Sequence, residues 1–223
     1  MNIAIISDIH GNSFVLEQAL KQINGNGINQ IYFLGDAVNY YPDCNEVIEL
    51  LKEYKVKCIK GNHDFMVQSN EVIEEKRALV YKLENTRKNI TKKNLAILKS
   101  WPSNIELTLF GKKILMVHGS PSNKFYGYIY PDTDLSIFKT EEFDFVFTGH
   151  THHSMIRKYN STVYVNPGSI GMPRDFGLQF SYATMNVENM EVKIEKLKIE
   201  KEKIVFLYKS EVHSAVLELL DRK

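Results

Sequence analysis

Five short apolar segments of this chain each lead into an aspartate, an asparagine or a histidine, and this arrangement constrains the fold more than any other feature of the sequence. Each segment has the length and apolar character of a buried β-strand. The segments and the residues that follow them are Ile3–Ile6 with Asp8, Ile31–Leu34 with Asp36, Val56–Ile59 with Asn62, Ile114–Val117 with His118, and Phe145–Phe147 with His150. Polar groups therefore gather where the predicted strands end.

Helices are predicted between the first three strands. Asn12 or Ser13 can cap the first helix, and a second helix is expected over about 45–54. The apolar face of the first helix consists of Val15, Leu16, Ala19, Leu20 and Ile23. Alternation of strand and helix predicts an α/β fold with parallel strands covered by helices. Ligands of such sheets bind beyond the carboxyl ends of the strands, so we expect the polar residues to converge on one site.

The rest of the chain is predicted to add helices and a hairpin. Residues 65–102 have a charged, helical pattern, which we interpret as a helical insertion over about 66–102 packed beside the site. A β-hairpin and a closing helix are predicted over residues 181–187, 190–199 and 210–220. No linker, repeat or low-complexity tract interrupts the chain, so one domain over 1–223 is expected.

Charge and composition disfavour several classes of protein. A formal net charge of +1 gives no broad field for binding nucleic acid, so such a partner is unsupported. A solvated helix face explains the local basic cluster better than a nucleic-acid patch does; this cluster is Arg87, Lys88, Lys92 and Lys93. The sequence shows no secretory signal and no apolar run of membrane-spanning length, so we expect a soluble, cytoplasmic protein. Cys44 and Cys58 are expected to be reduced core thiols.

Residues that can bind metal ions are concentrated in five short segments. These are Asp8-Ile9-His10, Gly35-Asp36, Gly61-Asn62-His63-Asp64, His118-Gly119 and Gly149-His150-Thr151-His152. One histidine at a strand end is more often a hydrogen-bonded loop residue than a ligand, but five of the seven histidines lie in these segments. Two divalent ions about 3.5–4 Å apart need a bridging ligand, and the carboxylate of Asp36 is suited to that position. The mixed donors favour manganese, with iron, zinc or nickel as alternatives.

With these motifs the sequence resembles the metallophosphoesterases of the calcineurin-like superfamily, and more closely their small bacterial and archaeal phosphodiesterase-like members. The resemblance covers nearly the whole chain and includes two late motifs, Asn166-Pro167-Gly168-Ser169 and Pro173-Arg174-Asp175, and the segment 40–45. It implies a fold of two mixed β-sheets packed face to face as a sandwich, flanked by helices. It also implies a site for two metal ions at the carboxyl ends of the strands.

The resemblance implies a role for each residue of the motifs. One ion would be held by Asp8, His10 and His152, and the other by Asn62, His118 and His150. Asp36 would bridge the two ions, and His63 would face the substrate, where an imidazolium can protonate the leaving oxygen.

Three further residues have two interpretations each. Asp64 either orients His63 and supports its protonation or caps a turn. Asn12 either contacts the substrate phosphate or caps the first helix. Arg174 either binds a phosphate oxygen or forms a surface ion pair with Asp175.

We therefore expect a binuclear metal-dependent phosphoesterase that hydrolyses a small phosphodiester or nucleotide-type phosphate ester by metal-activated hydroxide. A non-catalytic binding or scaffold protein of the same fold is one alternative, although no expected ligand is missing. A nuclease or a protein phosphatase is another, although no basic groove is apparent. The segment 125–130 adds a question about the substrate, because Tyr126, Tyr128 and Tyr130 fit either a stacking wall or, as their alternation favours, a half-buried strand.

Overall fold

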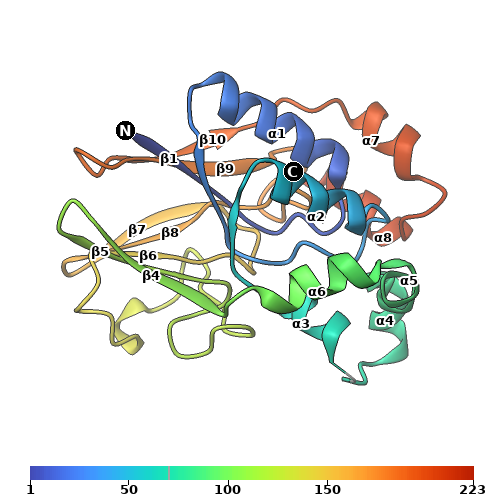
Figure 1. The fold of residues 1–223 in the computed structure, drawn as a ribbon, viewed down its shortest axis with the longest axis horizontal. Coiled ribbons are helices and arrows are strands. Elements are labelled where there is room, and N and C mark those ends of the chain that lie inside the picture. Colours follow the sequence, from blue (N-terminus) through green and yellow to red (C-terminus); the bar gives the residue numbers. More distant parts are fainter. Residues whose placement is uncertain (70) are drawn as a thin grey trace.

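A computed structural model describes residues 1–69 and 71–223. Within these residues, ten strands form two five-stranded β-sheets packed face to face (Figure 1). The sandwich implied by the resemblance is therefore confirmed. None of the described helices is long and apolar enough to cross a membrane.

The first sheet carries the predicted parallel strands. Its order is β10-β9-β1-β2-β3, with β1 (Asn2–Ile6), β2 (Gln30–Phe33), β3 (Lys57–Cys58), β9 (Ser181–Asn186) and β10 (Val192–Lys196). Strands β1, β2 and β3 pair in parallel, as the alternation of strand and helix predicts. Strands β9 and β10 form the predicted antiparallel hairpin, and β9 also pairs with β1.

The second sheet contains three strands that the sequence analysis did not identify. Its order is β4-β5-β6-β8-β7, with β4 (Asn104–Leu109), β5 (Lys112–Val117), β6 (Phe145–Phe147), β7 (Met155–Tyr159) and β8 (Thr162–Asn166). Strands β5 and β6 are predicted and pair in parallel. Strands β4 and β7 lie at the edges, and exposed residues such as Glu106 and Lys158 interrupt them, so they lack the continuous apolar run of a buried strand.

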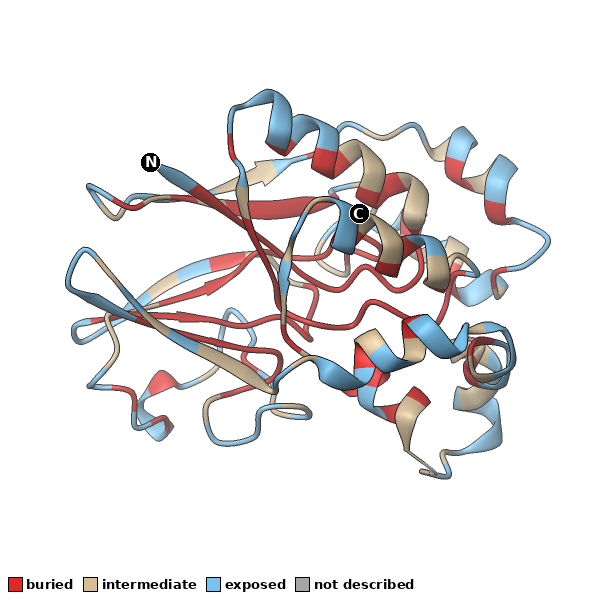
Figure 2. Ribbon diagram, in the orientation of Figure 1, coloured by how far each residue is buried: buried red, intermediate tan, exposed pale blue. Residues whose placement is uncertain are grey.

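Both faces of the first sheet are buried, which explains the continuous apolar runs in its strands. Successive side chains of a strand point to opposite faces. Ile3 and Ile5 of β1 pack toward the second sheet, whereas Ala4 and Ile6 pack toward the helices. Figure 2 shows that the loops leaving the strands toward the centre of the molecule are buried as well. These loops carry the residues of the five motifs.

Two helices cover the outer face of the first sheet, and four more lie beside the sandwich (Figure 1). The covering helices are α1 (Ser13–Gly25) and α2 (Cys44–Glu53). The helices beside the sandwich are α3 (Asn62–Gln68), α4 (Glu75–Tyr81), α5 (Leu83–Asn89) and α6 (Lys92–Ser100). Cys44 and Cys58 are free thiols.

The expectations for the closing helix and for the basic cluster both need correction. The predicted closing helix over 210–220 is wrong in its bounds, since the structure has α7 (Lys201–Tyr208), α8 (Ser214–Leu217) and a 3₁₀ turn, η2 (Glu218–Asp221). Helix α7 was missed because its apolar residues do not lie on one face: Ile204 is buried but Phe206 is exposed.

The basic cluster is also not uniformly solvated. The guanidinium of Arg87 turns inward and donates to the carbonyl oxygens of Met66, Ser69 and Glu71. Lys93 lies at the surface and pairs with Glu49. Arg87 therefore stabilises the segment that follows α3, and the solvated-face interpretation fits Lys93.

Candidate metal centre

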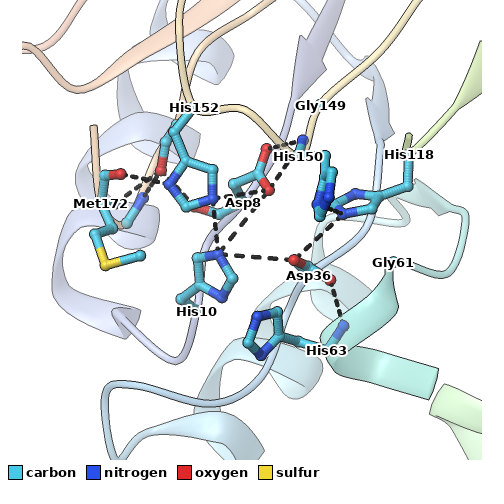
Figure 3. A network of polar contacts seen from close by, with 12 residues as sticks. Asp8, His10, Asp36, Gly61, His63, His118, Gly149, His150, His152 and Met172 are labelled. Atoms are coloured by element: carbon cyan, nitrogen blue, oxygen red, sulfur yellow. Dashed lines mark hydrogen bonds and ion pairs between the residues drawn. The ribbon is translucent and has the colours of Figure 1, made fainter. Parts of the chain in front are cut away.

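The carboxyl ends of four strands deliver the predicted site residues to one place. Asp8 follows β1, Asp36 follows β2, His118 follows β5, and His150 follows β6. Because β1 pairs in parallel with β2, and β5 with β6, the carboxyl ends within each pair lie at the same edge of their sheet. Figure 3 shows the side chains from both sheets pointing toward one another.

The structure brings all seven predicted ligand residues together. The ligand atoms of three buried triads lie within 4.8 Å of one another: Asp8 with His10 and His152, Asp36 with His118 and His150, and His10 with Asp36 and His63. Asn62, the seventh residue, joins the second triad, because its Oδ1 lies 2.9 Å from Nε2 of His118. The three triads overlap at His10 and Asp36, so the residues form one continuous cluster.

Backbone carbonyls fix the orientation of three imidazole rings. The Nδ1 atoms of His10, His118 and His152 contact carbonyl oxygens of Val38, Leu34 and Met172, at 3.3, 2.9 and 2.6 Å respectively. A carbonyl only accepts, so each Nδ1 carries the proton, and Nε2 of the neutral ring then presents a lone pair. All three Nε2 atoms face the interior of the cluster (Figure 3).

This donor set fits a bound cation. Nε2 of His10 and Nε2 of His152 are 3.1 Å apart, and the latter lies 3.3 Å from Oδ1 of Asp8. Nε2 of His118 similarly faces Nδ1 of His150 at 3.2 Å and Oδ2 of Asp36 at 3.3 Å. The facing lone pairs on Nε2 of His10 and Nε2 of His152 repel one another unless a positive charge lies between them. The clustered residues can therefore hold metal ions through imidazole, carboxylate and amide donors.

Burial and neighbouring charges shift the pKa values in the cluster. Burial opposes ionisation of Asp8 and Asp36, but the adjacent histidines outweigh it, and both carboxyl pKa values lie below their usual range. Burial lowers the pKa of His150 to about 3 and that of His10 well below its usual value. Burial also opposes protonation of His118, yet contact with Asp36 raises its pKa to about 9. The cluster thus attracts positive charge, and a divalent ion would displace the proton from His118.

Five residues of the cluster have a backbone conformation that residues other than glycine rarely adopt. Their φ angles are positive: 54° at Asp8, 53° at His10, 65° at Asp36, 66° at His150 and 59° at His152. Such conformations cost on the order of 1 kcal/mol or more each, and they concentrate at functional sites. The fold therefore holds these side chains in orientations that local backbone preferences do not favour.

Comparison with known proteins assigns the chain to a family. Residues 1–190 match the family model described as the calcineurin-like phosphoesterase superfamily domain. The chain belongs to this superfamily. An uncharacterised protein of Methanocaldococcus jannaschii is 31% identical to this chain, over 89% of this chain and 88% of that protein. Members of the superfamily use divalent metals, which agrees with the donor set described above.

Two solved structures share the fold of this chain. A hypothetical protein from Pyrococcus horikoshii OT3 is 22% identical, with a TM-score of 0.86 over 99% of this chain and 98% of that one. A metallophosphoesterase from Sphaerobacter thermophilus is also 22% identical, with a TM-score of 0.76 over the same shares. At this level of identity, the similarity establishes the fold and not the activity.

Asp64 organises the backbone around Asp36. Its carboxylate accepts hydrogen bonds from the N–H groups of Asp36, Ala37 and Gly61, at 2.8, 2.9 and 2.9 Å respectively. Burial and the charge of Asp36 raise the pKa of Asp64 to about 7, against the effect of these donors. Of its two interpretations, the structure shows the capping one, because the carboxylate binds backbone and not the ring of His63.

The polar partner of the His63 ring is Asn39, which sequence reasoning missed. Nδ2 of Asn39 lies 3.1 Å from Nδ1 of His63, and both side chains are buried. The backbone N–H of His63 donates to Oδ1 of Asp36 at 2.8 Å, which leaves Oδ2 facing His118. In the sequence, the only local signal for Asn39 is its place after the Gly35-Asp36 motif. In the structure it lies in a turn, where its φ is 74°.

Asn12 occupies the capping position that was one of its two interpretations. Its Oδ1 accepts from the N–H of Val15, and its Nδ2 donates to the carbonyl of Gly171, both at 3.2 Å. Its amide thus binds α1 to the loop that follows β8. The structure gives no separate indication of a phosphate contact at Asn12.

Arg174 does not form the surface ion pair that was considered for it. Asp175 instead accepts from the hydroxyl of Ser154 at 2.8 Å and lies 3.7 Å from the ammonium of Lys196. The guanidinium of Arg174 reaches the hydroxyl of Tyr40 at 3.4 Å. Because the Tyr40 ring lies 5.0 Å from the ring of His63, Arg174 remains a candidate for binding a substrate phosphate beside the metal centre.

Proposed function

We propose that this protein is a binuclear metal-dependent phosphoesterase that hydrolyses a small phosphodiester or nucleotide-type phosphate ester. The observation that carries the proposal is the pair of buried triads with converging acceptor atoms, with Asp36 beside both. Oδ2 of Asp36 lies 3.8 Å from Nε2 of His10 and 3.3 Å from Nε2 of His118, so one carboxylate reaches both triads. This position suits the bridging ligand that two adjacent ions require.

Divalent ions held by the triads, with manganese expected and iron, zinc or nickel as alternatives, would supply charge for phosphoryl oxygens and acidify a bound water. Phosphate binding and proton transfer would depend on side chains of the protein. We propose that Arg174, which contacts the Tyr40 hydroxyl, binds a free phosphoryl oxygen. His63 shares a cluster with His10 and Asp36, where it can deliver a proton to the leaving oxygen.

Burial opposes the protonation that this role requires, whereas neighbouring rings hold His63 in position. Burial lowers the pKa of His63 to about 4, so the ring is neutral near pH 7 in the free protein. A phosphate anion beside the ring would favour its protonated form. Three rings hold it in place from the sides, with centroids 4.6–5.0 Å away: His10, Tyr40 and Tyr81.

The test of the proposal is metal content together with a substrate screen. We expect two ions per chain after loading with manganese, because the ligands divide into two sets around Asp36. Elemental analysis of the loaded protein measures this number. Zero or one ion at saturation, with an intact fold, would contradict a binuclear site. A screen of phosphomonoesters, phosphodiesters and nucleotides with several divalent metals then identifies the reaction, and two bound ions without turnover would favour a scaffold.

Replacing Asn39 with Ala is expected to lower kcat/KM by about 10- to 100-fold while metal content stays unchanged. The variant keeps the His63 ring but removes the amide that holds its Nδ1. Steady-state kinetics with elemental analysis separate the two effects. Asn85→Ala on the exposed side of α5 is the control, and both quantities are expected to stay at wild-type values. If Asn39→Ala lost bound metal as well as catalytic rate, Asn39 would be shown to support the metal ligands and not His63.

A further inference from the structure

Three tyrosines are exposed on the loop between β5 and β6. Tyr126, Tyr128 and Tyr130 expose 38%, 51% and 37% of their surface. Ile129 between them is buried and belongs to the cluster on the outer face of the second sheet. Exposed and buried residues therefore alternate here, as the sequence suggests, but the buried residue is Ile129 and the segment forms no β-strand. The interpretation that these tyrosines belong to the core is wrong.

Two of these tyrosines extend an aromatic surface outward from the metal centre. The ring of Tyr128 lies 4.3 Å from the ring of His150, centroid to centroid, at an angle of 36°. The ring of Tyr130 is parallel to that of Tyr128 at 5.7 Å, and its edge meets His153 at 5.5 Å. We call Tyr128 and Tyr130 the tyrosine platform. The Tyr128 ring of this platform contacts the ring of His150, a predicted metal ligand.

Hydrogen bonds connect the loop that carries the tyrosine platform to its surroundings. The N–H of Gly119 donates to the carbonyl of Lys124 at 2.7 Å, and the N–H of Tyr130 donates to the hydroxyl of Thr133 at 2.8 Å. The hydroxyl of Tyr126 donates to the carboxylate of Glu71 at 3.0 Å and ties the loop to the helical segment. Rings fixed before a ligand arrives lose little conformational freedom when it binds. Preorganisation of this kind is typical of a binding surface.

We infer that the tyrosine platform binds a planar aromatic group of the ester, and that the enzyme therefore prefers phosphate esters that carry a nucleobase. This inference rests on the proposed function, because it assigns the phosphate to the metal centre. A group stacked on Tyr128 is then the part of the substrate next to that phosphate. Every nucleobase has a π-face that stacks on an aromatic side chain, and stacking on one ring changes binding by about 5- to 150-fold.

A pair of substrates that differ only in the base tests the inference. One is the methyl ester of a nucleoside 5′-monophosphate, and the other is the methyl ester of ribose 5-phosphate. We expect kcat/KM of the wild-type protein to be about 10- to 100-fold higher for the ester with the base. Tyr128→Leu keeps an apolar side chain without a ring and is expected to lose most of this ratio, whereas Tyr128→Phe keeps it.

Tyr159→Leu is the matched control, because Tyr159 on β7 is 37% exposed, like Tyr130, and its replacement leaves the ratio unchanged. If Tyr128→Leu shows a low melting temperature or loses metal, Tyr130→Leu replaces it in the same comparison. A wild-type ratio near 1, or a ratio that neither leucine variant changes, would overturn the inference while leaving the proposed function intact.

Binding separates the two proposals further. Calorimetric titration with a nucleoside 5′-monophosphate and with ribose 5-phosphate measures the preference for the base without turnover. A preference that Tyr128→Leu removes, in a protein that hydrolyses neither ester, would support the tyrosine platform and contradict the proposed function.

Discussion

Asp36→Asn is expected to weaken the binding of divalent ions by at least about 100-fold and to abolish phosphoester hydrolysis. Replacing a group that only supports a metal ligand typically costs about 10- to 100-fold in affinity, and Asp36 is itself within reach of both triads. The variant removes the shared negative charge from a buried site. It keeps an amide oxygen that can still accept from the N–H of His63, so the start of α3 is preserved.

The measurement is the melting temperature of the wild type and of Asp36→Asn, each with and without manganese. An ion that binds only the folded protein raises the melting temperature of the wild type, and this rise should disappear in Asp36→Asn. Asp144→Asn is the control, because Asp144 pairs with Lys112 at the surface and its replacement should leave the manganese effect in place. A variant that still binds two ions with wild-type affinity would show that Asp36 is not the bridging residue.

His63→Ala is expected to retain metal but to lower the rate of hydrolysis by about 10²- to 10⁴-fold for an ester with an alkyl leaving group. An alkoxide is a poor leaving group and needs a proton, whereas an aryl oxide leaves with little help. The loss for an aryl ester should therefore be much smaller. The comparison uses kcat for an alkyl and an aryl phosphodiester of similar size, with metal content measured on the same preparations.

His213→Ala is the control for this experiment, since His213 caps α8 and contacts none of the cluster residues among its described hydrogen bonds. Its replacement should change neither rate. Equal losses on the alkyl and aryl esters of His63→Ala would show that the ring positions the phosphate and donates no proton.

The sequence predicts most of the strands in which neighbouring residues share one environment, although the buried strand β8 was missed. Strands β1, β2, β5 and β6 are buried, so their apolar runs are continuous and mark both the strand and the position of the residue that follows. Edge strand β7 was missed because Ile156, Lys158 and Tyr159 are exposed and interrupt that pattern. Helix α7 was missed for a similar reason, since its apolar residues include the exposed Phe206 and Leu207 beside the buried Ile204 and Tyr208.

Within the candidate site, the residue types and their order are apparent from the sequence, but the contacts between distant segments are not. Asn39 approaches His63 only because the loop after β2 crosses the start of α3. The capping role of Asp64 depends on the same crossing, since its carboxylate accepts from Asp36 and Ala37. The positive φ angles of the cluster could not be predicted either, because aspartate and histidine adopt them only where the surrounding fold imposes them.

Each of the two main triads takes its residues from both β-sheets. Asp8 and His10 follow β1 of the first sheet, whereas His152 follows β6 of the second, 142 positions from His10 in the sequence. An ion bound by either triad would therefore cross-link the two layers of the sandwich, as a disulfide links distant segments of a chain. The complete set of ligands exists only when both layers have assembled, so tight binding of an ion would require the assembled sandwich. Once formed, the cross-link keeps the layers from separating until the ion is released.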